Sequence, residues 1–323
     1  MLKINKITSK SFLFVGLFIF LYFSAAENIN AFPEFDYDGR ADFGVFRPSG
    51  RIWYSYSTES ETSSGFQWGL PTDVLVPADY DGDGLTDIAV WRPENGVWYV
   101  HRSRDSKLFA IQWGTTTVYG FGSIPDVPVP ADYDGDGLTD FAVWRPDTGI
   151  WYVLQSSDDY NPVYAKYYQW GILGDVPVEA DYDGDGRADI AIFRSTENRW
   201  YIRQSSNNQW YSVNFARAGE DLLVPADYTG DGKADLAFYR NGTWHIRNSE
   251  NNQVEIQQFG MRGDKPVPAD YDGDRKTDIA VYRNGTWFIL ESSTKQFRTF
   301  YYGVATDIPL ASTRVKPSIV PVP

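Results

Sequence analysis

The sequence predicts an all-β fold, a β-propeller most simply built from six four-stranded blades. One acidic nine-residue loop returns six times along the chain, at nearly regular spacing. Between the loops lie short runs rich in Val, Ile, Trp, Tyr and Phe, bounded by Gly, Pro, Asn and Ser, which are typical of strands. No segment after residue 30 shows sustained helical periodicity. Because a single four-stranded sheet cannot bury both of its faces, repeated sheets of this kind are expected to pack radially.

Residues 1–26 are predicted to be a signal peptide. Three lysines precede an apolar run from Phe12 to Phe23, and Ser24-Ala25-Ala26 offers small residues for cleavage after Ala26. An uncleaved membrane anchor is the alternative, but the run is shorter than the roughly 20 residues that a spanning helix needs. We therefore expect a secreted protein, extracellular or at the cell surface, with no membrane insertion after the signal is removed.

Composition narrows the partners and the means of stabilisation. The 323 residues carry a formal net charge of −14, and loss of the three lysines of the leader would make it −17. Such a charge argues against nucleic acid and anionic membranes as partners. The chain has no cysteine, so disulfides are excluded. Bound metal can take over part of that stabilising role.

The repeated loop has the form Asp-x-Asp-x-Asp-Gly-x-x-Asp, and its clearest copy runs from Asp79 to Asp87. Four carboxylates within nine residues repel one another unless a cation lies among them, and hard oxygen ligands at alternate positions suit Ca²⁺. The six loops are spaced by 45, 53, 49, 46 and 43 residues and begin at Glu34, Asp79, Asp132, Asp181, Asp227 and Asp270. The sequence therefore predicts up to six calcium ions.

Each unit repeats the same order of segments. In the second unit, residues 76–79 lead into the loop, and apolar runs follow at 87–91, 97–100 and up to Trp113. In the last two units the middle turn is Asn-Gly, which favours a two-residue hairpin. These Asn-Gly-Thr triplets also match glycosylation sequons, and whether they carry sugar stays open. One tryptophan position recurs in every unit and is expected to pack blade against blade: Trp53, Trp98, Trp151, Trp200, Trp244 and Trp287.

Closure of the ring has more than one solution. We expect Phe32-Pro33-Glu34 to supply the entering strand of the first unit. The segment Asp307–Ala311 resembles a further entering strand without a loop, and would either pair with the first blade or form a loose tail. Six blades are predicted, with a seventh, partly formed or contributed by another chain, as the alternative. The propeller is assigned to residues 27–312, and residues 313–323 to a Pro-rich flexible tail.

Loop, spacing and strand order together resemble the FG-GAP/VCBS repeats, found in the propeller headpiece of integrin α subunits and in secreted bacterial proteins. The resemblance spans about residues 32–312. It implies that each loop joins the first two strands of a blade and binds Ca²⁺ through side chains at loop positions 1, 3, 5 and 9 and the backbone carbonyl at position 7.

The resemblance thereby assigns ligands in all six loops. The side-chain ligands are Glu34, Asp36, Asp38 and Asp42; Asp79, Asp81, Asp83 and Asp87; Asp132, Asp134, Asp136 and Asp140; Asp181, Asp183, Asp185 and Asp189; Asp227, Thr229, Asp231 and Asp235; and Asp270, Asp272, Asp274 and Asp278. The carbonyl ligands are those of Leu85, Leu138, Arg187, Lys233 and Lys276.

Three loops depart from the pattern. The first begins with Glu34 and has Tyr37 in place of a glycine, so that an alternative alignment would shorten it and lose a ligand. The fifth has Thr229 where the second acid belongs. The sixth has Arg275 in place of a glycine, which is strained if its φ is positive. We therefore expect the tightest binding at the loops that start at Asp79, Asp132 and Asp181.

Two other interpretations of the loop are weaker. An EF-hand needs a bidentate acid at position 12 and flanking helices, whereas position 12 of the second loop is Val90 and the flanks are predicted strands. A metal-free acidic turn is the other alternative, because Asp and Gly favour turns. Four acids in five of the six loops argue against it.

The predicted function is that of a calcium-stabilised extracellular binding or adhesion module, with a protein or a glycan as partner. The only histidines, His101 and His245, fall at non-equivalent positions, and no recognisable nucleophile motif is present. We therefore do not expect an enzyme, although a hydrolase with paired carboxylates is compatible with the composition. The alternatives are a carbohydrate-binding lectin with pockets between blades, and a self-assembling extracellular structural protein.

Two further features have open interpretations. Trp210, beside Tyr211, is the one tryptophan off the repeat, and is either an exposed strand aromatic or a contact residue. An arginine recurs after the second strand of every unit, as Arg47, Arg92, Arg145, Arg194, Arg240 and Arg283. These arginines either pair within their own blades, by stacking on a neighbouring aromatic ring or bonding turn carbonyls, or form a ring for an acidic ligand.

Overall fold

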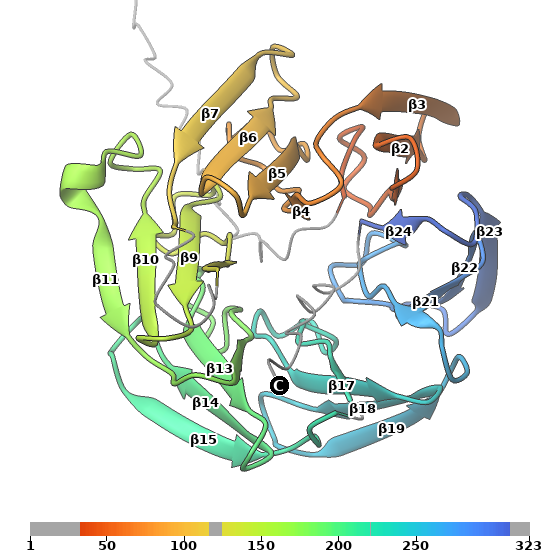
Figure 1. Ribbon diagram of the computed structural model, residues 1–323. Helices are drawn as coiled ribbons and strands as arrows, with labels where there is room; N and C mark the ends of the chain where they lie inside the picture. The colour runs from red at the N-terminus through yellow and green to blue at the C-terminus, as the bar shows by residue number, and fades with distance from the viewer. Residues whose placement is uncertain (1–32, 116–124, 220, 311–323) are drawn as a thin grey trace, which may run out of the picture.

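Six four-stranded antiparallel sheets surround a central axis (Figure 1). This computed structural model describes residues 33–115, 125–219 and 221–310. The predicted all-β propeller of six blades is confirmed. The one helical element in these ranges is a 3₁₀ turn at Pro162–Tyr164, and none of the described helices is long and apolar enough to span a membrane. The predicted signal peptide and Pro-rich tail lie outside the described residues.

Each blade is a meander whose strands follow one another from the axis outward. Blade two comprises β4 (Val74–Leu75), β5 (Ile88–Arg92), β6 (Val97–His101) and β7 (Leu108–Gln112). Blade three comprises β8 (Val127–Pro128), β9 (Phe141–Arg145), β10 (Ile150–Leu154) and β11 (Lys166–Gln169), and blade four β12 (Asp175–Pro177), β13 (Ile190–Arg194), β14 (Arg199–Arg203) and β15 (Trp210–Asn214). Blade five comprises β16 (Leu222–Leu223), β17 (Leu236–Arg240), β18 (Thr243–Arg247) and β19 (Val254–Gln258), and blade six β20 (Lys265–Pro266), β21 (Ile279–Arg283), β22 (Thr286–Leu290) and β23 (Phe297–Tyr301).

Blade one is assembled from both ends of the described chain. Its outer strands are β1 (Phe43–Arg47), β2 (Ile52–Ser57) and β3 (Thr62–Gln67), and its innermost strand is β24 (Ile308–Pro309). The Leu310 N–H donates to the Gly44 carbonyl at 2.9 Å, extending the antiparallel pairing of β24 with β1. Of the two alternatives for this segment, pairing with the first blade is therefore confirmed.

The prediction of an entering strand at residues 32–34 is wrong, because Pro33 and Glu34 belong to no strand. Among the described residues of that segment, the Pro33 carbonyl accepts one bond from the Asp42 N–H at 2.6 Å, while β24 takes the strand position. β24, at the C-terminal end of the described chain, can occupy the innermost position of blade one because residues 307–310 resemble the entering segments of the other blades. The described residues form six complete sheets and no partial seventh.

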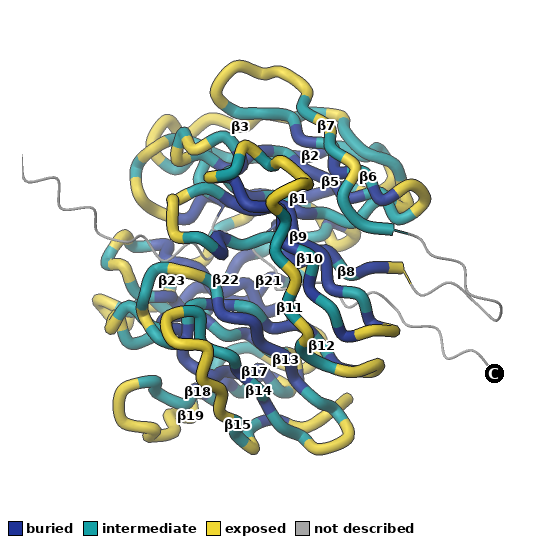
Figure 2. Tube along the Cα trace, turned by 90° about the vertical axis from the view of Figure 1, so that its left-hand side faces the viewer, coloured by how far each residue is buried: buried dark blue, intermediate teal, exposed yellow. Residues whose placement is uncertain are grey.

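The repeated tryptophan is the centre of each blade's core. All six of these side chains are at most 2 % exposed. Each buried indole N–H is satisfied by a backbone carbonyl just past the outer strand, as where Trp98 Nε1 donates to the Trp113 carbonyl at 2.8 Å. Aromatic rings of neighbouring blades also contact one another: Tyr80 of blade two stacks on Phe141 of blade three, with ring centroids 4.8 Å apart. The predicted blade-to-blade packing is confirmed, with exposed residues concentrated in turns and outer strands (Figure 2).

The recurring arginines pair within their own blades, and the expected aromatic contact is present, but their hydrogen-bond partners are aspartate carboxylates and not the turn carbonyls that were expected. Arg92 donates through Nε and Nη2 to both carboxylate oxygens of Asp73, at 2.8 and 2.9 Å, and its guanidinium lies 4.3 Å from the Tyr99 ring centroid. In the order of the blades the carboxylate partners are Asp307, Asp73, Asp126, Asp175, Asp221 and Asp264. Since these donors are occupied, a ring of free arginines for an acidic ligand is not present among the described residues.

The two Asn-Gly turns are tight hairpins. Asn241 and Gly242 have φ values of 50° and 92°, and the flanking Arg240 and Thr243 pair directly. Positive φ at both central residues is the geometry that Asn-Gly favours. The predicted two-residue hairpins are confirmed.

Candidate metal centre

The acidic loops lie at one end of the ring, because each of them leads into the second strand of its blade. In blades two to six the loop also follows the innermost strand, whereas in blade one that strand is β24. Neighbouring loops are joined by backbone hydrogen bonds, in which the position-8 N–H of one loop donates to the position-1 carbonyl of the preceding loop. Thr139 donates to Asp79 at 2.8 Å in this way, and Ala41 donates to Asp270 at 2.6 Å. The other four bonds are Thr86 to Glu34, Ala188 to Asp132, Ala234 to Asp181 and Thr277 to Asp227. The six loops therefore form a closed circuit.

The position-1 carboxylate organises each loop by capping its own turn. In the second loop, Asp79 Oδ1 accepts from the Gly82 N–H at 2.7 Å and Asp79 Oδ2 from the Gly84 N–H at 2.8 Å. Both glycines have positive φ, 71° and 86°, which explains why glycine recurs at positions 4 and 6. The turn directs the remaining carboxylates toward one another.

The two loops with a bulky residue in place of glycine keep the same backbone. Tyr37 and Arg275 have φ values of 69° and 68°, so the strain expected at Arg275 is confirmed. In the first loop the Phe35 N–H donates to Asp42 Oδ2, as the Tyr80 N–H does to Asp87 Oδ2 in the second. The nine-residue alignment of the first loop is therefore correct, and the shortened alternative is wrong.

Five of the six loops bring three acidic side chains together, each contributing an oxygen within 4.8 Å of the others. The groups are Glu34, Asp36 and Asp42; Asp79, Asp81 and Asp87; Asp132, Asp134 and Asp136; Asp181, Asp183 and Asp189; and Asp270, Asp272 and Asp278. Four groups combine positions 1, 3 and 9, and the third loop combines positions 1, 3 and 5. The fifth loop, residues 227–235, is fully described and forms no such group, with Thr229 at position 3. The assignment of the position-7 carbonyls stays a prediction.

A serine in the turn between the third and fourth strands completes each site. In blade two the Ser103 N–H donates to Asp87 Oδ1 at 2.7 Å, and its hydroxyl lies 2.9 Å from both oxygens of Asp83. The equivalent residues are Ser156, Ser205, Ser249 and Ser292, with Thr58 in blade one. The sequence interpretation missed these residues. Their signal is a hydroxyl side chain 14 or 16 residues after position 9 in every unit.

Asp81 of the second group has no hydrogen bond to its carboxylate. Its side chain is 6 % exposed, and neither carboxylate oxygen has a hydrogen-bond partner within 3.5 Å. Its one charged partner is Arg104, whose Nε lies 3.9 Å from Asp81 Oδ1 and whose side chain is 55 % exposed, so that this ion pair is weak. In the third, fourth and sixth loops the corresponding carboxylate accepts a serine hydroxyl instead, from Ser157, Ser206 and Ser293.

A buried, unsatisfied carboxylate costs several kcal/mol unless a cation accompanies it. The position-3 oxygen Asp183 Oδ1 of the fourth loop is likewise buried and unpartnered. Both residues belong to groups of three carboxylates, and none of the five groups contains a histidine or cysteine ligand. Such a donor set fits a hard divalent cation.

Burial also changes the titration of the position-9 carboxyls. It raises the pKa of Asp87 to about 7 and that of Asp140 to about 8, and the negative charge of Asp134 adds to the effect at Asp140. Burial likewise raises the pKa of Asp189 and of Asp278 to about 7. Without a cation these groups therefore hold protons near neutral pH, and a bound cation would have to displace them.

Comparison with known proteins agrees with this geometry. A family profile described as "FG-GAP-like repeat" matches residues 79–143 and 181–238, and these ranges contain the second to the fifth acidic loops. No curated protein matches the chain significantly.

Several solved structures share the fold at low sequence identity. An Agrocybe aegerita lectin, described as recognising non-reducing terminal N-acetylglucosamine, is 14 % identical with a TM-score of 0.54, over 84 % of this chain and 85 % of the lectin. TolB from Acinetobacter baumannii is 11 % identical with a TM-score of 0.55, over 83 % of this chain and 66 % of TolB. At these identities the likeness supports the propeller fold alone. Together with the six blades and the acidic loop of each, the family match over residues 79–143 and 181–238 supports an FG-GAP-like repeat β-propeller.

Proposed function

We propose that this protein is a secreted propeller whose acidic loops bind calcium and which serves as an extracellular binding or adhesion module. The observation that carries the calcium part is Asp81, a carboxylate that is 6 % exposed, lies among other acids, has no hydrogen-bond partner and has only a 3.9 Å ion pair to the exposed Arg104. Such an arrangement is stable at neutral pH when a cation supplies the missing charge.

Calcium is the favoured ion because it takes six to eight oxygen ligands in a flexible geometry. The side chains at positions 1, 3, 5 and 9 would hold it, with the position-7 carbonyl as a further ligand. When bound, the ion would neutralise the acidic group. It would also fasten the loop to the serine turn, since Ser103 already bonds the carboxylates at positions 5 and 9.

A binding role, and no catalytic one, is favoured by the surroundings of the two histidines. His101 packs against the ring of Phe66 at 4.3 Å, and His245 stacks on Phe238 at 4.5 Å, so both are part of aromatic packing. A rigid ring that presents loops and grooves suits recognition of an extracellular protein or glycan. The net charge of −14 disfavours nucleic acid. Secretion rests on the predicted leader.

The test is a calcium count combined with thermal unfolding, with and without a chelator, on the chain without residues 1–26. We expect several bound calcium ions and a midpoint that falls when EGTA is added. Asp81→Asn should lower the calcium count by about one, whereas Asp147→Asn, an exposed acid outside the loops, should leave it unchanged. A protein with no bound calcium and no response to EGTA would contradict the proposal.

A further inference from the structure

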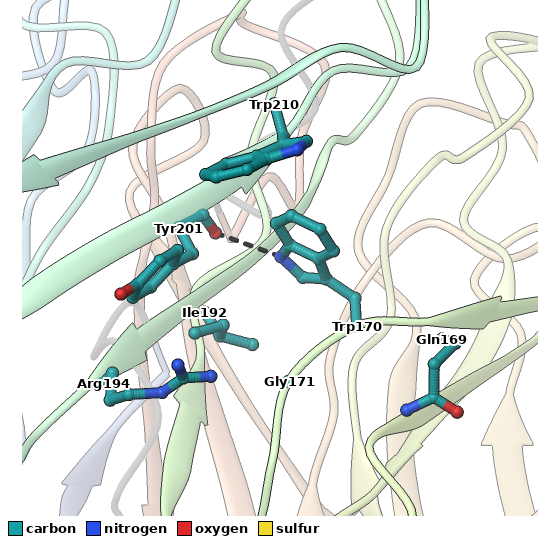
Figure 3. Close-up of a pocket in the computed structure, with 7 residues that line it drawn as sticks. All are labelled: Gln169, Trp170, Gly171, Ile192, Arg194, Tyr201 and Trp210. Atoms are coloured by element: carbon teal, nitrogen blue, oxygen red, sulfur yellow. Dashed lines mark hydrogen bonds between the residues drawn. The ribbon is translucent and has the colours of Figure 1, made fainter.

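A cleft opens between blades three and four (Figure 3). Its volume is about 370 Å³. Gln169 and Trp170 line it from the end of β11, and Ile192, Arg194, Tyr201 and Trp210 line it from β13, β14 and β15. Trp170 Nε1 donates to the Tyr201 carbonyl at 3.2 Å, so the wall from blade three is fixed to blade four.

Trp210 is not accounted for by the packing of the propeller. It is 61 % exposed, whereas the repeated tryptophans of the blade cores are at most 2 % exposed. At the same place in the outer strands of blades two, five and six lie Leu108, Val254 and Phe297, as the pairing of these strands shows. Trp210 therefore adds a second indole to this junction, 6.1 Å from Trp170 at an angle of 61°.

The charged groups of the cleft are already neutralised. Arg194 donates to both oxygens of Asp175 at 2.9 Å and reaches Glu197 at 3.4 Å. The Tyr201 hydroxyl donates to Glu197 as well. No free positive charge is therefore offered to an anion, and the cleft suits a neutral ligand.

The rim keeps polar groups beside the aromatic walls. The Gln169 amide nitrogen donates to the Thr148 carbonyl at 2.7 Å, which leaves the amide oxygen as an acceptor at the rim. Small-molecule sites commonly combine apolar and aromatic walls with a few placed polar groups, in volumes of roughly 300–1,000 Å³. This cleft is at the small end of that range.

We propose that the cleft binds a neutral saccharide of one or two pyranose rings. A pyranose has C–H faces that can cover an indole, while its hydroxyl groups point outward to water and to polar side chains. That distribution matches two tryptophans with Gln169 at the rim. An acidic sugar would gain no ion pair in the cleft, because Arg194 is already paired with Asp175 and Glu197. The inference rests on the proposed function as a binding module and names the ligand class of one site.

The experiment uses the chain without its leader, in calcium, on a glycan array that includes neutral, sialylated and sulfated glycans, followed by titration with the best neutral mono- or disaccharide. Trp210→Ala should weaken binding at least about tenfold, since the variant loses one aromatic wall. Phe297→Ala is the matched control, because Phe297 occupies the same strand position and is 60 % exposed. It should bind like the parent, and Trp210→Phe should fall between the two.

Three outcomes would overturn the inference: no binding of neutral saccharides, equal binding by Trp210→Ala and the parent, or binding confined to acidic glycans. A proline-rich peptide is titrated in parallel, and capture of the peptide without any sugar counts as the first outcome. The calcium count of the same samples is measured without saccharide. A full calcium count with no saccharide bound therefore refutes this inference alone, whereas a protein without calcium refutes the proposed function.

Discussion

Asp307 closes the ring, and replacing it with asparagine tests how much that closure contributes. Both of its carboxylate oxygens accept from Arg47 of β1, at 2.9 Å each, and its Oδ2 also accepts from the Val304 N–H. The side chain is fully buried, and no other described ion pair joins β24 to blade one. The Asp307→Asn variant keeps the volume and removes the charge.

The magnitude follows from the contacts. Removing one partner of a buried ion pair costs about 3–5 kcal/mol. The Arg47 side chain is 29 % exposed, so water recovers part of that loss. We therefore expect the free energy of unfolding to fall by about 2–3 kcal/mol, close to the value of one charge-assisted hydrogen bond in a low-dielectric site.

The assay is urea unfolding together with amide hydrogen exchange, and Asp73→Asn is the matched control. Asp73 makes the same two-bond contact to Arg92, but its strand β4 continues into the second acidic loop. Both variants should lose similar free energy of unfolding, whereas only Asp307→Asn should speed exchange in β1, because β24 can then leave the sheet alone. Equal exchange in β1 for both variants, or a loss below about 1 kcal/mol for Asp307→Asn, would refute the reasoning.

Three further predictions concern the loops. In EGTA the melting temperature should fall as the pH rises from about 5 to 8. Burial in the folded protein raises the pKa of Asp87 to about 7 and that of Asp140 to about 8. The folded protein therefore binds protons that the unfolded chain has already released, and this stabilisation is lost as the pH rises. With calcium the trend should reverse, since the ionised carboxyls bind the ion; a metal-free midpoint that rises with pH would contradict the assignment. Arg275→Gly should stabilise the protein by about 1 kcal/mol in urea unfolding, because it relieves a positive φ. Gly84→Ala, at the same loop position, should destabilise it by a similar amount in the same assay, and equal signs for the two variants would count against the strain argument.

The sequence was sufficient for the fold because its information is repeated six times in local segments. Strand order, loop position and the buried tryptophans all follow from patterns within about 50 residues. Ring closure was open because the contact between Arg47 and Asp307 spans 260 residues and leaves no local pattern. The other arginine partners lie 19 residues before each arginine, in an Asp-x-x-x-Pro or similar segment that was interpreted only as the start of a strand.

The site was predictable in its ligand types and less so in its details. The spacing of the acids identifies them in the sequence. The hydroxyl residue of the serine turn also recurs, 14 or 16 residues after position 9, but only the folded blade shows that it contacts the loop. Asp81 lacks the serine hydrogen bond that its counterparts have, because Arg104 occupies the position of that serine in the third, fourth and sixth units. Where the Arg104 side chain points cannot be predicted from the sequence. The exposure of Trp210 is similarly a property of the junction between two blades.

The closed circuit of backbone hydrogen bonds couples each of the six acidic turns to its two neighbours. A turn that loosens on losing its ion also loosens the carbonyl to which its neighbour donates, so that ions should be released in concert and calcium titration should be steeper than for independent sites. The hydrogen bond from the Ala41 N–H to the Asp270 carbonyl belongs to the same circuit and joins the first blade to the last. Calcium bound in any of the loops would thus stabilise the contact between the first and last blades. A calorimetric titration with a Hill coefficient of one would show that the turns act separately.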